Sequence, residues 1–155
     1  MKLHILSVGQ RMPAWVTQAY GEYAKRMPRE MTVNLIEIPN AKGANWAAER
    51  IIQDESERLL KAIPKNASIV LLDVKGQSWS TEKLAEKMSD WRQSGQDWVF
   101  VIGGANGVSS EFRAQAALRW SLSEATFPHP MVRIILVEQL YRAWTILSGH
   151  PYHRE

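Results

Sequence analysis

The last six residues of the chain carry the densest group of side chains that could do chemistry. Residues 150–155, His-Pro-Tyr-His-Arg-Glu, place two imidazoles, a phenol and a guanidinium around a proline. An imidazole can move a proton near neutral pH, and a guanidinium offers directed donors to a phosphate or an oxyanion. Chain ends are usually poorly ordered. The tail is therefore either a flexible remnant or part of a site, and a terminal segment can reach a neighbouring subunit.

A glycine-rich turn at residues 103–107, Gly-Gly-Ala-Asn-Gly, is a second candidate. It follows a predicted strand and precedes a predicted helix, so its amides could approach a ligand closely or bind an anion. The order of its glycines fits neither the GxGxxG fingerprint nor a phosphate-binding loop, which needs a following Gly-Lys-Ser/Thr. The spacing leaves a plain tight turn and a ligand loop equally open.

Two further candidates follow predicted strands. Asp73 could accept a hydrogen bond from a ribose or an amine, or it could simply cap a turn before Gly76. Residues 124–130, Glu-Ala-Thr-Phe-Pro-His-Pro, contain two prolines that stiffen the loop and hold His129 in a defined direction. Such a loop could line an adenine pocket with backbone groups, or it could be a connection whose histidine is solvated.

Other chemistries are poorly supported. His129, His150 and His153 could bind zinc, but no acidic or thiol ligand stands at metal spacing, so we expect no metal. A serine hydrolase is not indicated either, because there is no Gly-x-Ser-x-Gly elbow and no Ser-His-Asp set can be placed. The chain has no cysteine, which excludes disulfides, thiolate ligands and a cysteine nucleophile.

Alternating strand and helix patterns must position these residues. We predict strands at residues 2–8, 31–38, 68–72, 98–102 and 120–123, and helices at about 13–26, 46–63, 80–94, just after Ser109 or Ser110, and about 131–147. No repeat, low-complexity tract or linker interrupts them. The pattern predicts one α/β domain over residues 1–155, a mostly parallel sheet flanked by helices. Ligands bind such sheets outside the carboxyl ends of the strands, which places loops 73–79, 103–109 and 124–130 at the expected site.

The helix at about 131–147 is apolar on nearly every side. In a chain of 155 residues this pattern predicts burial in a subunit interface with two-fold symmetry. Glu138 and Arg142 stand four residues apart in the favourable order, so we interpret them as an ion pair on the surface or in that interface.

Charge and hydropathy narrow the class of protein. The net charge of +3 comes from scattered basic residues without a long run, so an arginine-rich RNA arm is not expected, while a diffuse basic face remains open. The first apolar run is too short for a signal peptide, and no segment is long enough to span a bilayer. We therefore expect a cytoplasmic protein that is not bound to a membrane.

Several segments taken together resemble one family closely. They are residues 8–9, 12–16, 35–39, 102–107, 120–123, 127–130, 137–144 and 150–155. This set resembles the ribosomal large-subunit pseudouridine N3-methyltransferases of the SPOUT class, and the likeness covers the whole chain. No one segment is specific, but the combination is.

The resemblance implies an α/β fold with a C-terminal trefoil knot, a homodimer, and S-adenosylmethionine as methyl donor. The implied cofactor pocket consists of Leu72, Asp73, Gly103, Gly104, Leu122, Ser123, Glu124, Ala125, Thr126, Phe127 and Pro128. Members of the family often have a hydrophobic residue at the position of Glu124, so its contact is expected through the backbone. A knot is a rare exception to the rules of chain connection, and the pattern of elements does not predict it.

The implied substrate is a pseudouridine in a stem-loop of 23S rRNA, methylated on the assembled 70S ribosome. Its N3 must lose a proton as it attacks the methyl group, and nearby donors can stabilise the anionic base. The candidate catalytic residues are His129 and, from the tail of the partner subunit, Tyr152, His153 and Arg154. His153 could take the proton, and Arg154 suits contact with a phosphate or an oxyanion.

Two other functions remain open from the residues. A non-catalytic ribosome-binding or RNA-binding dimer could use the same face, and it would not bind S-adenosylmethionine. A nucleotide-binding hydrolase of doubly wound type lacks both a phosphate loop and a nucleophile signature.

Overall fold

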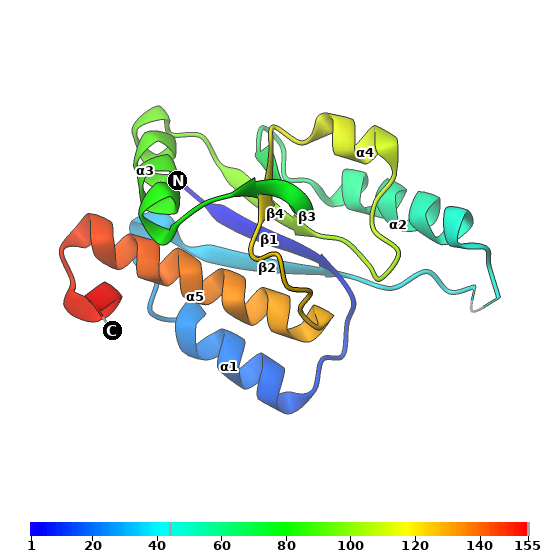
Figure 1. Ribbon diagram of the computed structural model, residues 1–155, viewed down its shortest axis with the longest axis horizontal. Helices are drawn as coiled ribbons and strands as arrows, with labels where there is room; N and C mark the ends of the chain where they lie inside the picture. Colours follow the sequence, from blue (N-terminus) through cyan, green and yellow to red (C-terminus); the bar gives the residue numbers. More distant parts are fainter. Residues whose placement is uncertain (44, 155) are drawn as a thin grey trace.

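The computed structural model describes residues 1–43 and 45–154, and it has one parallel sheet with helices on both faces (Figure 1). The strands are β1 (Leu3–Val8), β2 (Val33–Ile38), β3 (Ser68–Ser78), β4 (Trp98–Ile102) and β5 (Leu118–Ser121). The helices are α1 (Ala14–Ala24), α2 (Ala48–Ala62), α3 (Thr81–Ser94), α4 (Ser110–Gln115) and α5 (His129–Ser148), with 3-10 turns η1 (Arg29–Met31) and η2 (Pro151–Arg154). The strand order is β2-β1-β4-β3-β5, and the α/β class predicted from the sequence is confirmed.

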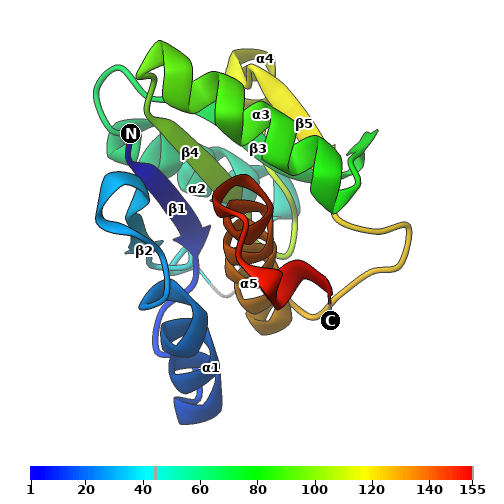
Figure 2. The same ribbon diagram turned by 90° about the vertical axis from the view of Figure 1, so that its left-hand side faces the viewer.

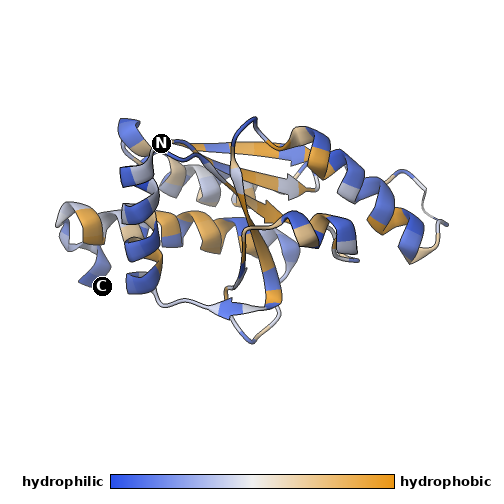
Figure 3. Cartoon of the chain, turned by 90° about the horizontal axis from the view of Figure 1, so that it is seen from above, coloured by the Kyte–Doolittle hydropathy of each residue, from blue (hydrophilic) through white to orange (hydrophobic). Residues whose placement is uncertain are grey.

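Alternating side chains on the central strands build a separate apolar cluster on each face of the sheet. Phe100 of β4 belongs to the cluster completed by Leu136 of α5, on the face that α1 and α3 also cover. Its neighbour Val101 belongs to the cluster completed by Leu59 of α2 and Phe112 of α4. Figures 1 and 2 show α2 and α4 on the opposite side of the sheet from α1 and α5. The strands are accordingly the most apolar part of the chain in Figure 3, as expected for a parallel sheet covered on both faces.

Strand β3 is longer and less regular than the sequence predicts. Trp120 of β5 pairs with both Leu72 and Gln77, so residues 73–76 bulge out of the ladder between two registers. The predicted loop 73–79 is therefore wrong, because β3 resumes and runs to Ser78. The apolar run ends at Leu72, and the pairing beyond it depends on a strand more than forty residues away, which no local pattern reports. The last strand also begins earlier than predicted, at Leu118.

Helix α5 begins at His129, two residues before the predicted start. His129 is therefore in the first turn of a helix and not in a stiff loop. The two prolines are compatible with this, because Pro128 is the N-cap and Pro130 falls at the start of the helix, where a missing amide hydrogen costs nothing. Gly149 ends the helix in the left-handed conformation, as its glycine predicts.

No helix within residues 1–43 and 45–154 is long and apolar enough to cross a membrane. The trefoil knot is a matter of chain threading, which strand order does not fix, and it stays a prediction.

Gly76 is the residue on which the bulge depends, because a β-carbon there would lie 2.7 Å from the carbonyl carbon of Arg119 and 2.7 Å from the amide nitrogen of Trp120. We expect Gly76→Ala to lower the free energy of unfolding by about 1–3 kcal/mol, since backbone must move to admit the methyl group. Gly21→Ala is the matched control. It adds a methyl group in open space on α1 and should raise the free energy of unfolding by about 0.5–1 kcal/mol.

Urea denaturation of the two variants measures both effects. An unchanged unfolding midpoint for Gly76→Ala would show that the bulge does not need the close approach.

Candidate functional site

A cavity of about 490 Å³ opens at the carboxyl end of β4 and beside the middle of β3, where its bulge begins. It is bounded by the start of the β3 bulge, the glycine-rich turn after β4 and the segment between β5 and α5. The predicted cofactor residues that line it are Leu72, Asp73, Gly103, Gly104, Leu122, Ser123, Ala125, Thr126 and Phe127. Glu124 and Pro128 are not among its lining residues, and Glu124 is exposed.

The glycine-rich turn presents backbone, not side chains, to this cavity. A β-carbon on Gly103 would lie 3.0 Å from Cγ1 of Val108, and one on Gly104 would clash with the carboxylate of Glu55. The turn closes when the amide of Gly107 donates to the carbonyl of Gly104 at 3.0 Å. It is thus a tight turn whose backbone also forms a cavity wall, and its role as a ligand loop stays a prediction.

Asp73 caps a turn, one of the two interpretations of its sequence position, and it also lines the cavity, while contact with a ligand stays a prediction. One carboxylate oxygen accepts the amide hydrogen of Lys75 at 3.0 Å, which caps the bulge. The other lies 3.5 Å from Nε of Arg113 on α4, and the side chain is only 10% exposed. Each oxygen keeps a lone pair that can accept from a ligand hydroxyl or amine. Arg113 lines the same cavity and was not predicted, because its pairing with Asp73 spans forty residues.

His129 stands on the cavity wall with one ring nitrogen engaged. Its Nε2 lies 3.1 Å from the carbonyl oxygen of Gly103. A carbonyl only accepts, so Nε2 carries the hydrogen and Nδ1 is left as an acceptor. Burial, reinforced by the charge of Arg133, lowers the pKa of His129 below its usual 6.5. The ring is therefore neutral at pH 7 and able to take a proton.

Arg133 fixes the start of α5 to the sheet. The side chain is buried, and its guanidinium lies 2.7 Å from a carboxylate oxygen of Glu37 on β2. It also donates to the hydroxyl of Ser7 at 3.2 Å and to the carbonyl of Gly9 at 3.4 Å. A charge among apolar residues in the first turns of α5 is the signal that could have revealed this residue, since a buried charge requires partners. The sequence does not say which partners.

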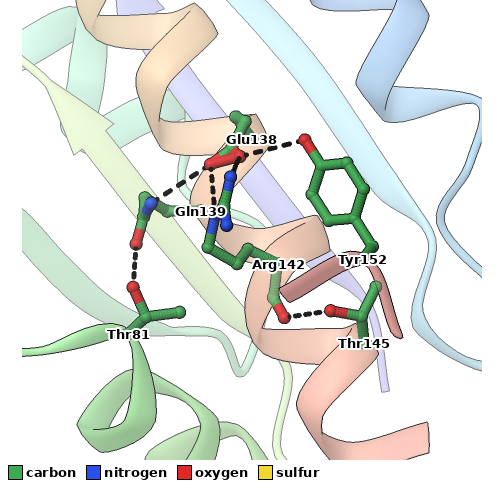
Figure 4. A network of polar contacts seen from close by, with 6 residues as sticks. All are labelled: Thr81, Glu138, Gln139, Arg142, Thr145 and Tyr152. Carbon is green, nitrogen blue, oxygen red and sulfur yellow. Dashed lines mark hydrogen bonds and ion pairs between the residues drawn. The ribbon is translucent and has the colours of Figure 1, made fainter. Parts of the chain in front are cut away.

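The tail is ordered as η2 and folds back on its own α5 (Figure 4). The hydroxyl of Tyr152 donates to Glu138 at 3.3 Å, and its ring centre lies 4.8 Å from that of Tyr141. Glu138 also pairs with Arg142 at 3.0 Å, which confirms the predicted ion pair. Figure 4 shows Gln139 continuing this network to Thr81 at the start of α3.

The tail and the cavity of one chain are not brought together. Tyr152, His153 and Arg154 are absent from the residues that line the cavity, whereas His129 is among them. Glu138, which Tyr152 contacts, lies nine residues after His129, or about 14 Å along the helix axis. In Figure 1 the C-terminus lies beside the far end of α5, away from its first turn.

Tyr152 is a hydrogen-bond donor in this setting. Burial and the neighbouring carboxylate of Glu138 raise the pKa of Tyr152 to about 12. The phenol therefore stays protonated at any physiological pH and cannot act as a general base. As for metal ligands, no cluster of three or more His, Cys, Asp or Glu side chains suited to an ion occurs in the part of the chain that the structure describes.

The comparison with known families decides the assignment. A sequence model described as "Predicted SPOUT methyltransferase" matches residues 1–153. The chain belongs to this family. The family expected from the sequence is thus confirmed, and three of the segments through which the chain resembles it, 102–107, 120–123 and 127–130, contribute to the cavity.

Individual relatives agree along the full length. The ribosomal RNA large subunit methyltransferase H of Thioalkalivibrio sulfidiphilus is 53% identical over 156 residues, covering 100% of both chains. The protein of the same name from Methylococcus capsulatus is 51% identical, over 99% of this chain and 100% of the relative. A probable methylase family protein from Haemophilus influenzae has a similar fold, with a TM-score of 0.55 at 12% identity over 97% of this chain and 69% of its own.

The state of His129 can be measured directly. We expect NMR titration of its ring protons to give a midpoint below 6.5, because burial disfavours the imidazolium. Glu55→Gln should lower the midpoint further, since the Glu55 carboxylate favours the charged ring. A lowered pKa means that the contribution of His129 to stability is complete above pH 6.5 and is lost as pH falls through the lowered value. A midpoint at or above 6.5 would contradict the burial argument.

Proposed function

We propose that the protein transfers a methyl group from S-adenosylmethionine to N3 of a pseudouridine in a stem-loop of 23S rRNA. Its substrate is the assembled 70S ribosome, and it acts in the cytoplasm as a homodimer of one-domain subunits. The observation that carries the proposal is the cavity at the carboxyl end of β4 and beside the bulge of β3. Three of the segments by which the chain resembles this family line it, in a chain 53% identical to a protein named for methylating large-subunit ribosomal RNA.

The cavity suits an adenosyl group. Leu72, Leu122 and Val132 give it apolar walls, as an adenine ring requires. Asp73 supplies a carboxylate for a hydroxyl or an amine, and the turn at Gly103 and Gly104 allows a ligand to approach the backbone. When bound, S-adenosylmethionine supplies a methyl group on a positively charged sulfur, a good electrophile.

The residues of the chain then have to accept one proton and stabilise one developing negative charge. N3 of the base must lose its proton as its bond to the methyl carbon forms. His129 is neutral and keeps Nδ1 as an acceptor, so it can hold or receive a proton at the cavity wall. Tyr152 remains protonated and can only donate to the anionic base.

The other tail residues act from the partner subunit. His153 is the proposed acceptor of the proton, and Arg154 offers its guanidinium to a phosphate or to the base oxygen. These side chains do not line the cavity of their own chain, which supports an arrangement in which each tail completes the pocket of the other subunit.

The outer face of α5 supports a dimer. A stripe at helical spacing stays partly exposed although the rest of the helix packs against α1, α3 and the sheet, and the chain's own Tyr152 contacts the middle of this stripe. It consists of Met131, Ile135, Glu138, Arg142 and Ile146. Apolar positions flank a central ion pair, which is the composition of a two-fold interface with a polar element that sets its register.

Methyl transfer from labelled S-adenosylmethionine tests the function. We expect transfer to 70S ribosomes that lack the modification, at a single pseudouridine, and far less transfer to free 23S rRNA. Calorimetric titration with S-adenosylmethionine is the accompanying measurement, and it should show binding that Ala125→Arg, which fills the cavity, abolishes. A folded protein that binds ribosomes but not S-adenosylmethionine would instead establish the non-catalytic RNA-binding alternative.

A further inference from the structure

A second cavity, of about 320 Å³, lies on the other side of the β3 bulge. We call it the bulge groove, and its lining residues are Lys75, Gly76, Gln77, Ala117, Leu118 and Arg119. The two cavities meet at the bulge. Asp73 and Val74 line the methyl-donor cavity, whereas the next two residues line the groove. Whatever binds in the groove is therefore adjacent to the mouth of the donor cavity.

The groove carries two positive charges and no acidic side chain. Lys75 and Arg119 are both exposed, and within the described residues neither forms an ion pair or a side-chain hydrogen bond. The nearest carboxylate along the chain, Asp73, is occupied by Arg113 and by the amide of Lys75. Lys25 and Arg26, by contrast, both have Glu22 as an acidic partner. Lys75 and Arg119 therefore have no acidic partner within the described residues.

The backbone beneath these two side chains is fixed. Gly76 lies so close to β5 that a β-carbon would meet the backbone of Arg119 and Trp120. Gln77 then returns to the ladder opposite Trp120. Lys75 and Arg119 thus project from two strands whose backbones are held next to each other by close packing.

An exposed apolar side chain stands between the groove and the donor cavity. Val74 is 63% exposed, and Trp15 is the one other large hydrophobic residue with comparable exposure in the described part of the chain. It lines the mouth of the cavity, and Lys75 follows it directly. A strand of RNA has the matching order of groups, an apolar base face beside a phosphate.

We propose that the bulge groove binds a backbone phosphate of the substrate RNA next to the nucleotide that is methylated. Lys75 and Arg119 pair with the phosphate, and Val74 contacts the adjoining nucleoside at the entrance to the donor cavity. The inference rests on the proposed function and adds to it the place where the RNA strand enters. No covalent step involves these residues, so their contribution is to binding and orientation of the RNA.

Paired charge-removal variants test this proposal. Lys75→Ala/Arg119→Ala should weaken binding of a 23S rRNA stem-loop about tenfold near physiological salt and reduce the salt dependence by about one phosphate contact per cation removed. With 70S ribosomes as substrate, KM should rise while kcat is unchanged. The control is Lys61→Ala/Lys65→Ala, which removes two exposed charges that precede the amino end of β3 and do not line the groove. It should leave both quantities near wild type.

Two results of these measurements would overturn the proposal. Equal effects of the two double variants would overturn the proposal, since net charge alone would then explain the loss. Weakened binding to ribosomes with unchanged binding to the RNA stem-loop would also overturn it, by identifying an acidic protein surface as the occupant. If Lys75→Ala/Arg119→Ala fails to bind S-adenosylmethionine and so is misfolded, the isosteric Lys75→Met and Arg119→Gln single variants carry the test.

RNA binding is measured here without methyl transfer. A wild-type protein that binds the stem-loop through the groove but transfers no methyl group would therefore contradict the proposed function alone.

Discussion

Helix α5 separates the donor cavity from the tail, and polar contacts fix the helix at both places. At its first turn the buried guanidinium of Arg133 pairs with Glu37, and removing one partner of such a pair costs several kcal/mol. This contact holds His129 against the carbonyl of Gly103 on the cavity wall. Farther along, Glu138 holds Tyr152 and Arg142. Because the helix is rigid and Tyr152 is held on it, the tail stays off the cavity of its own chain.

The edge of the sheet depends on a second constraint, the double pairing of Trp120. A regular β3 would carry its side chains past the cavity in strict alternation. The bulge between Leu72 and Gln77 instead turns Asp73 and Val74 toward one cavity and Lys75 toward another. The close contact of Gly76 with β5 makes this possible, and the two cavities are consequences of one backbone irregularity. We propose that the donor cavity binds the methyl donor and that the bulge groove binds the RNA backbone.

The parts of this structure that are encoded locally can be predicted from the sequence. Apolar runs gave the central strands, and the position of Asp73 and of the turn at Gly103 after such runs placed them at the carboxyl edge. Contacts between segments that lie far apart in the chain cannot be predicted in this way. The residues next to Arg113 and Arg133 in the chain do not indicate which carboxylate each arginine pairs with. Likewise, the residues next to Leu72 do not indicate that β3 resumes after a bulge. The prolines beside His129 are compatible both with a loop and with the start of a helix, and the structure has the helix start.

The central claim is that a functional pocket takes its cavity from one subunit and its tail from the other. Mixed dimers test it most directly, with one subunit lacking residues 152–155 and its partner carrying Ala125→Arg in the cavity. Each variant alone should form an inactive dimer. The mixed dimer retains one cavity that the intact tail of the other subunit can complete, so the account predicts about half of the wild-type methyl transfer to 70S ribosomes. If the mixed dimer is as inactive as its parents, the tail acts within its own chain and the account is wrong.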